Sequence, residues 1–263
     1  MISFVGAGPG APDLITLRGR DRLAAADVVV WASSLVPDAL LAHARPGAEV
    51  HDSAGMTLED VLAVYAAHPD SAIVRLHSGD PALYGAIGEQ IEWCLANGRD
   101  FEIVPGVSSL AAGAAALGRE LTVPGVAQSV ILTRLPGRTA ASVPAGESLA
   151  ALAAHGATMG VFLSGARPEE LQRELLAGGS YTPATPAAVI VRATWPDEAV
   201  YPTTLADLAA TVRRSGATRT VLVLVGDALD PGAGAGRSHL YAPEYAHAFR
   251  RRSAPGSTTG RPA

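Results

Sequence analysis

The sequence contains no lysine: the 20 residues that carry a permanent positive charge are all arginine. This excludes any mechanism that needs a lysine amine, such as a Schiff base. A single cysteine, Cys94, excludes an internal disulfide and suits a reducing compartment, so we expect a cytoplasmic protein. No uninterrupted apolar run is long enough to cross a bilayer, and the chain starts with a strand pattern, so we expect neither a membrane partner nor a signal peptide.

Charged residues are also scarce, at 17% of the chain, and the formal net charge of -5 argues against a general nucleic-acid partner. A chain of 263 residues that is 48% hydrophobic can bury a substantial core. Strand and helix patterns alternate along it, which predicts two α/β domains. We expect an N-terminal domain over residues 1–118, a C-terminal domain over 119–231 and an extension over 232–263 that is disordered beyond residue 250.

The first strand, residues 1–5, leads into the glycine-rich loop Gly6–Pro12 and then a helix. This order is typical of a nucleotide-binding half. However, the glycines do not fall in the G-x-G-x-x-G pattern, and Ala32–Val36 stands where a ribose-binding acid is expected. No Gly-Lys-Ser/Thr phosphate loop is present either. The loop therefore has the shape of a nucleotide site without the signatures for pyrophosphate or ribose.

A second strand-end loop follows the apolar run at residues 73–76. Asp80 has the chemistry of an N-cap, and Pro81 suits the first position of the helix that we expect to start there. Gly79 lets the main chain approach a ligand closely. An ordinary capped turn between a strand and a helix would give the same pattern, so the loop alone does not establish a site.

A third loop, Pro105–Ser109, separates the strand at 101–104 from a helix of small residues at 110–117. In each of the three loops a strand ends, glycine exposes the main chain and a helix begins. Open α/β sheets bind ligands at the carboxyl ends of their strands. Three such loops at one sheet edge therefore predict a ligand crevice.

These loops resemble those of the tetrapyrrole methyltransferase family, in the motifs Gly6–Gly10, Ser78–Gly85 and Pro105–Ser109. Five further segments narrow the resemblance to members that methylate carbon 11 of a cobalamin precursor: Trp31–Val36, Val130–Arg138, His155–Met159, Phe162–Ser164 and Leu240–Arg250. The resemblance implies two α/β domains, usually in a homodimer, with S-adenosylmethionine in the cleft between them. It also implies a tetrapyrrole substrate and C-methyl transfer.

The resemblance further implies which residues contact the cofactor, mostly through main-chain atoms. They are Pro9, Ser78, Gly79, Asp80, Leu83, Ser108, Ser109, Leu163 and Ala193. The last two, from the second domain, would close over the adenine. No dedicated nucleophile is needed, and His77 is the one candidate acceptor for a proton, although a structural histidine would fit that position equally well.

Bound tetrapyrroles of this kind carry many carboxylates, which arginine can pair with in a bidentate manner. Arg134, Arg138 and Arg18 are the candidates, and surface salt bridges would account for each of them equally well. No other histidine or cysteine stands at metal-ligand spacing from His239 or His247 in the sequence, so we predict no metal site.

Three alternatives remain open at this stage. The first is an oxidoreductase that binds a dinucleotide at the glycine loop. The second is a methyltransferase for another corrinoid carbon, for RNA or for a protein. The third is a binding module without catalysis. The sequence also leaves open whether the substrate already carries cobalt.

Overall fold

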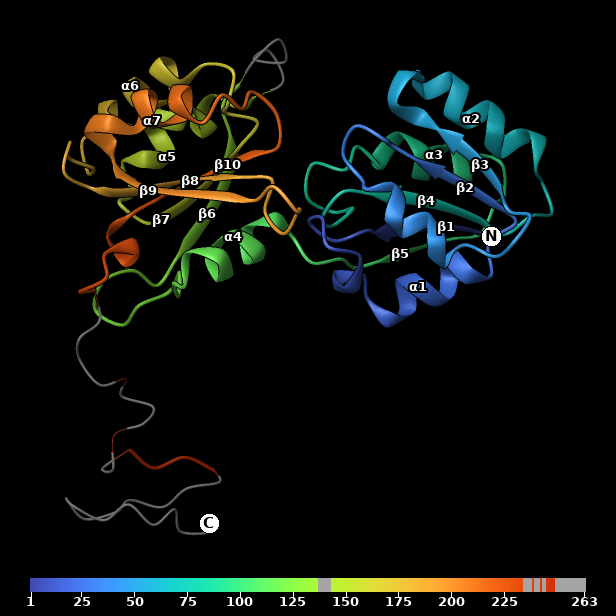
Figure 1. The fold of residues 1–263 in the computed structure, drawn as a ribbon, viewed down its shortest axis with the longest axis horizontal. Helices are drawn as coiled ribbons and strands as arrows, with labels where there is room; N and C mark the ends of the chain where they lie inside the picture. Colours follow the sequence, from blue (N-terminus) through green and yellow to red (C-terminus); the bar gives the residue numbers. More distant parts are fainter. Residues whose placement is uncertain (137–142, 234–237, 239–241, 243–244, 249–263) are drawn as a thin grey trace.

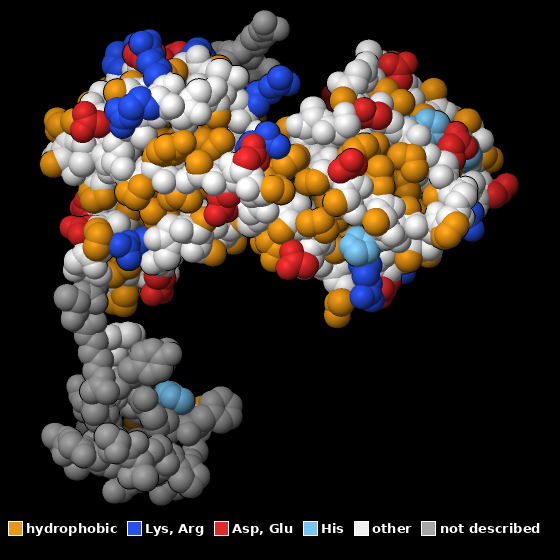
Figure 2. Space-filling model, in the orientation of Figure 1, with side chains coloured by type: hydrophobic (Ala, Val, Ile, Leu, Met, Phe, Trp, Pro, Cys, Tyr) orange, Lys and Arg blue, Asp and Glu red, His pale blue; other side chains and the backbone are white. Residues whose placement is uncertain are grey.

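The structure is a computed structural model that describes residues 1–136, 143–233, 238, 242 and 245–248. It contains two α/β domains, each built on a five-stranded sheet, as the sequence predicts (Figure 1). Figure 2 shows the domains as two lobes, with charged side chains of both signs scattered over the visible face. None of the helices in these residues is long and apolar enough to cross a membrane.

The sheet of the first domain is entirely parallel, in the order β3-β2-β4-β1-β5. In the register, Gly6 lies beside His77 and Val5 beside Val104. The carboxyl ends of β1, β4 and β5 are therefore neighbours, which brings the three predicted loops together. The strands are β1 (Ile2–Gly6), β2 (Val28–Trp31), β3 (Glu49–Asp52), β4 (Ile73–His77) and β5 (Phe101–Val104).

Both faces of this parallel sheet are covered by helices, as such sheets require. Helix α1 (Leu17–Ala24) packs on one face, where Leu23 joins a cluster with side chains of β1, β2 and β4. Helices α2 (Leu58–Ala67) and α3 (Gly88–Ala96) pack on the other face through Tyr65 and Cys94 (Figure 1). Thr57 caps α2 in a capping box with Asp60.

The sheet of the second domain is mixed, in the order β6-β7-β10-β8-β9. Only β6 and β7 are parallel, and the other neighbours are antiparallel. Helices α5, α6 and α7 cover one face. The elements are β6 (Val130–Arg134), α5 (Leu149–Ala153), β7 (Thr158–Phe162), α6 (Pro168–Ala177), β8 (Pro186–Val191), β9 (Ala199–Thr204), α7 (Leu208–Arg214) and β10 (Val221–Val225). Short 3-10 helices occupy Pro12–Leu14, Asp38–His43, Ser53–Gly55, Ala145–Glu147, Leu205–Asp207 and Asp227–Leu229.

Helix α4 (Ser109–Leu117) covers the other face of the second sheet. Its Ala112 shares a core cluster with Ile190 and Leu222, which come from β8 and β10. The sequence analysis placed this helix in the first domain, with the boundary at residue 118. In the structure the packing changes from one sheet to the other before Ser109, since Leu110 and Ala112 of α4 pack in the cluster formed by β8 and β10.

The helix expected to begin at Pro81 begins instead at Gly88. The intervening residues include Tyr84 and Ala86, whose φ angles are 58° and 49°. A left-handed residue cannot continue a right-handed helix, so Asp80 caps a single turn rather than α3. Strands β3 and β9, which the sequence analysis did not predict, are edge strands with mostly exposed or half-buried side chains.

Candidate functional site

The first two strand-end loops touch through their main chains. Gly79 N donates to Gly8 O at 2.8 Å, and Gly8 N donates to Gly79 O at 3.3 Å. Gly79 has a φ of 66°, a conformation that favours glycine. This pairing fixes the loop after β1 against the loop after β4 without any side chain.

The third loop packs against the other two at Gly106. A Cβ atom on this residue would lie 2.1 Å from Gly79 O and 2.7 Å from the Cα of Gly6. Side chains at these positions would therefore force the loops apart. The glycines allow three main-chain segments to meet at one edge of the sheet.

Asp80 joins two of these loops through its carboxylate. Its Oδ1 accepts a hydrogen bond from Ala82 N at 2.8 Å, and its Oδ2 accepts one from Gly106 N at 2.8 Å. Hydrogen bonds to a carboxylate are stronger than those between neutral groups. The residue expected to cap a helix thus holds the second and third loops together.

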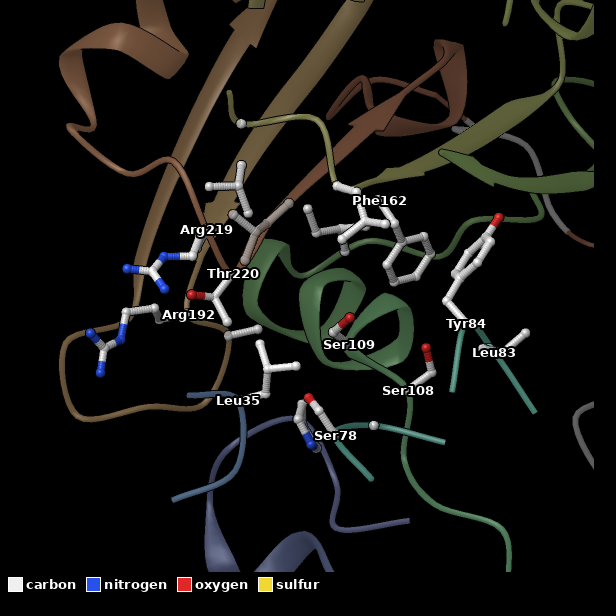
Figure 3. A pocket seen from close by; sticks show the side chains of 18 of the residues that line it. Leu35, Ser78, Leu83, Tyr84, Ser108, Ser109, Phe162, Arg192, Arg219 and Thr220 are labelled. Carbon is white, nitrogen blue, oxygen red and sulfur yellow. The ribbon is translucent and has the colours of Figure 1, made fainter. Parts of the chain in front are cut away.

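A cavity of about 360 Å³ lies between these loops and the second domain (Figure 3). This volume falls within the range of small-molecule sites. All nine residues predicted to contact a cofactor line it: Pro9, Ser78, Gly79, Asp80, Leu83, Ser108, Ser109, Leu163 and Ala193. The structure therefore brings together residues that are up to 184 positions apart in the chain, since the set runs from 9 to 193.

The cavity has an aromatic side and a cationic side. Tyr84 and Phe162, one from each domain, lie with their ring centres 5.4 Å apart. Arg192 and Arg219 lie on the opposite side in Figure 3. Arg192 pairs with Asp197 at 2.9 Å, whereas Arg219 makes no ion pair within the described part of the chain.

The three arginines predicted to bind substrate carboxylates lie elsewhere. Arg134 ends β6, and its charge acts on Tyr84: burial raises the pKa of the Tyr84 phenol, and Arg134 opposes that rise. Arg18 is exposed on α1 and lines neither of the two cavities described here. Arg138 lies outside the described residues. The sequence analysis missed Arg192 and Arg219. Arg192 directly follows the carboxyl end of β8, the kind of position that carries ligand contacts in α/β sheets, whereas Arg219 precedes β10 and no local signal marks it.

His77, the candidate proton acceptor, is buried at the end of β4 and does not line the cavity. Burial, together with the nearby Arg75 guanidinium, lowers its pKa to about 3. Its ring packs near Phe4, with ring centres 6.1 Å apart. A neutral histidine in the core, away from the cavity, fits the structural interpretation of this residue.

A second, more open cavity of about 790 Å³ lies beside the first. It is lined by Gly10, Ala11, Pro12, Trp31, Ser33, Val36, Pro37, Asp38, Ala39, Arg192, Thr194, Trp195, Pro196 and Asp197. Arg192 and Trp195 line both cavities and so form part of the wall between them. In the described part of the chain no group of three or more histidine, cysteine or acidic side chains is placed to hold a metal ion.

The fold and the site define a two-domain α/β protein with a small-molecule cavity between strand-end loops of one domain and the sheet of the other. The chain belongs to the tetrapyrrole (corrin/porphyrin) methylase family, whose sequence profile matches residues 1–209.

Three known proteins are particularly informative. The precorrin-4 C(11)-methyltransferase of Mycobacterium tuberculosis is 47% identical over 243 residues, which cover 92% of this chain and 96% of the relative. The crystal structure of a cobalt-precorrin-4 methyltransferase, a cobalamin biosynthetic enzyme, superposes with a TM-score of 0.83 at 45% identity and covers 88% of this chain and 96% of that one. The uroporphyrin-III C-methyltransferase of Thermus thermophilus in complex with S-adenosylhomocysteine gives a TM-score of 0.70 at 30% identity, over 87% and 98% of the two chains.

Proposed function

We propose that the protein is an S-adenosylmethionine-dependent C-methyltransferase that acts at C11 of precorrin-4 or cobalt-precorrin-4 in cobalamin biosynthesis. We further propose that it works in the cytoplasm as a homodimer. The names of the relatives, which match over nearly their whole length, support the reaction. The single observation that carries the proposal is the meeting of all nine expected cofactor residues in one cavity.

The cavity suits S-adenosylmethionine in size and in chemistry. The strand-end loops of the first domain line one side of it, and the φ of 66° at Gly79 favours a residue without a side chain there. Ser108 and Ser109 stand at the start of α4, where the first N–H groups of a helix have no partner within the helix. Leu110 N donates to the Ser108 hydroxyl at 3.2 Å, so the other N–H groups of the first turn would receive the carboxylate of the methionine part.

When bound, S-adenosylmethionine supplies an electrophilic methyl group on a sulfonium. The residues of the chain then have to orient donor and acceptor and exclude water. Orientation of this kind lowers a barrier by roughly 7–11 kcal/mol. Pro9, Ser78 and Gly79 would hold the donor from the first domain, while Leu163 and Ala193 would cover it from the second. We assign no proton transfer to His77.

The tetrapyrrole would approach along the aromatic side of the cavity. Leu163 is 69% exposed and Tyr84 49% exposed, so apolar surface is open to solvent at this edge. A flat macrocycle could cover it, since large exposed apolar side chains in a group commonly mark a binding site. Arg134 lies near Tyr84 and would meet the peripheral carboxylates.

Two measurements test the proposal. Calorimetry should detect binding of S-adenosylhomocysteine and no binding of NADH or NADPH. Mass spectrometry of reactions with precorrin-4, with and without cobalt, should then detect a product heavier by one methylene unit in at least one of them. Binding of a dinucleotide instead would support the oxidoreductase alternative, and cofactor binding without turnover of either substrate would support the binding module.

A further inference from the structure

A segment that follows β8 reaches from the second domain to the first loop of the first domain. Trp195 Nε1 donates a hydrogen bond to Pro9 O at 3.0 Å. Thr194 Oγ1 accepts one from Ala11 N at 2.9 Å. Two side chains of one domain therefore hold main-chain groups on both sides of Gly10 in the other domain.

The fit between the segment and the loop depends on Gly10. A Cβ atom on this residue would lie 2.3 Å from Cδ1 of Trp195 and 2.9 Å from Oγ1 of Thr194. Any side chain at this position would push the indole away from Pro9. The loop is thus shaped to receive the Trp195 side chain.

The segment is itself held in a defined conformation. The Arg192 guanidinium lies over the Trp195 ring, 4.5 Å from its centre, and pairs with Asp197. Glu198 accepts a hydrogen bond from Thr194 N at 2.6 Å. Arg192 and Thr194 have φ angles of 51° and 67°. Such strained residues persist only where their surroundings hold them, and they are frequent at ligand clamps.

The segment also lies where it can control a ligand. Pro9, whose carbonyl accepts from Trp195, lines the smaller cavity, and Trp195 forms part of the wall between the two cavities. Movement of this wall would join the cavities and expose the smaller one to the larger, more open one.

We propose that Arg192–Glu198 is an interdomain latch, in which Thr194 and Trp195 are positioning residues. The latch holds the first loop to the second domain and thereby slows the departure of a ligand from the smaller cavity. The identity of that ligand rests on the proposed function, whereas the latch itself does not.

Hydrogen exchange on the ligand-free protein tests the latch directly. Thr194→Val removes the acceptor for Ala11 N, and Trp195→Phe removes the donor to Pro9 O. In both variants the amides of the first loop should exchange roughly two- to tenfold faster, the factor that corresponds to the loss of one hydrogen bond. Thr194→Ser, which keeps the hydroxyl, should restore the exchange of the wild type. Trp93→Phe, on α3 and outside both cavities, is the matched control and should leave the loop unchanged.

Gly10→Ala tests the same contact from the first domain. It leaves the latch side chains intact but displaces the indole, so it should speed exchange as Trp195→Phe does. Thermal melts of each variant will identify any that fail to fold. If Gly10→Ala fails to fold, the exchange rates of Thr194→Val and Thr194→Ser still show whether the Thr194 hydroxyl holds the loop. Loop amides that exchange at the wild-type rate in folded Thr194→Val and Trp195→Phe would overturn the proposal.

The second readout is the dissociation rate of S-adenosylhomocysteine measured by stopped flow. It should rise roughly two- to tenfold in Thr194→Val, Trp195→Phe and Gly10→Ala, with a smaller change in kcat at saturating cofactor. An unchanged dissociation rate in variants whose loop has loosened would overturn the role in ligand release. Failure of the unaltered protein to bind the compound would refute the proposed function alone, because the exchange experiment contains no cofactor.

Discussion

Asp80 and Gly106 are joined by a hydrogen bond of 2.8 Å from the main-chain N–H of Gly106 to Oδ2 of Asp80. The other carboxylate oxygen accepts from Ala82 N. One side chain thus fixes the loop after β5 to the loop after β4 and closes the turn in which it lies. The floor of the cavity depends on this double acceptor.

Asp80→Asn should therefore weaken both the fold and the cavity. The two N–H groups approach different oxygens of the carboxylate, and asparagine replaces one of these oxygens with an NH2 donor, so one N–H group loses its acceptor. We expect the free energy of unfolding to fall by about 2 kcal/mol, and the affinity for S-adenosylhomocysteine to fall with it. Urea unfolding and calorimetry measure the two effects. Asp70→Asn is the control, because Asp70 is exposed and makes no ion pair within the described residues; equal effects of the two substitutions would contradict the assignment.

Gly106→Ala should separate the loops. The added Cβ would lie 2.1 Å from Gly79 O, and neither main chain can yield without breaking its pairing. We expect a loss of about 3 kcal/mol in the free energy of unfolding. Gly88→Ala is the matched control, because Gly88 is the first residue of α3 and a Cβ there meets nothing within 4 Å. It should leave stability unchanged or raise it by about 0.5–1 kcal/mol. Similar stability of the two variants would show that the loops are not closely packed.

His77 should make stability depend on pH. Its pKa of about 3 in the folded protein lies below the value of about 6.5 in an unfolded chain. The unfolded state therefore binds the extra proton first as the pH falls. The contribution of the neutral His77 to the free energy of unfolding is therefore fully present above about pH 6.5. It decreases by roughly 1.4 kcal/mol per pH unit as the pH falls to about 3.

Urea unfolding should show that the free energy of unfolding is lower at about pH 5 than at about pH 7, with about 2 kcal/mol of the difference due to His77. His77→Phe should reduce the loss by that amount, because phenylalanine does not titrate and can pack beside Phe4. An NMR titration that finds an ordinary pKa for His77 in the folded protein would rule out this account.

Arg134→Gln should weaken tetrapyrrole binding but leave the affinity for the cofactor unchanged. Losing one charge-assisted contact to a carboxylate should raise KM for the tetrapyrrole roughly ten- to one hundredfold. The affinity for S-adenosylhomocysteine should stay the same, because Arg134 does not line the cavity. Arg18→Gln is the control with the same change of charge, at an exposed position on α1 outside both cavities. A KM that rises equally in both variants would indicate a general effect of charge.

Strands β1, β2, β4 and β5 of the first domain could be predicted, because short stretches of sequence carry their signals. Parallel buried strands give continuous apolar runs such as Val28–Trp31, and glycine and proline mark each strand end. The resemblance to the family then supplied nine of the residues that line the cavity. The α4 helix shows the limit of such reasoning, since small residues fit either sheet and only the tertiary packing assigns the helix to the second one.

The side-chain contacts between the domains could not be predicted. Trp195 lies 186 positions after its partner Pro9, and no local pattern connects them. Arg192 adopts a left-handed conformation that sequence would not predict for arginine. The direction of its side chain, and hence its place in the wall of the cavity, depends on that conformation.

The boundary between the loop after β5 and α4 also determines how the two domains could separate. Gly106 is bound to Asp80 in the first domain, while Ser108 caps a helix that packs on the second sheet. Val107 alone stands between these anchors. If the domains separate, the chain would bend at this residue. Ser108 and Ser109 would then move with the second domain, whereas Ser78 and Gly79 would stay with the first.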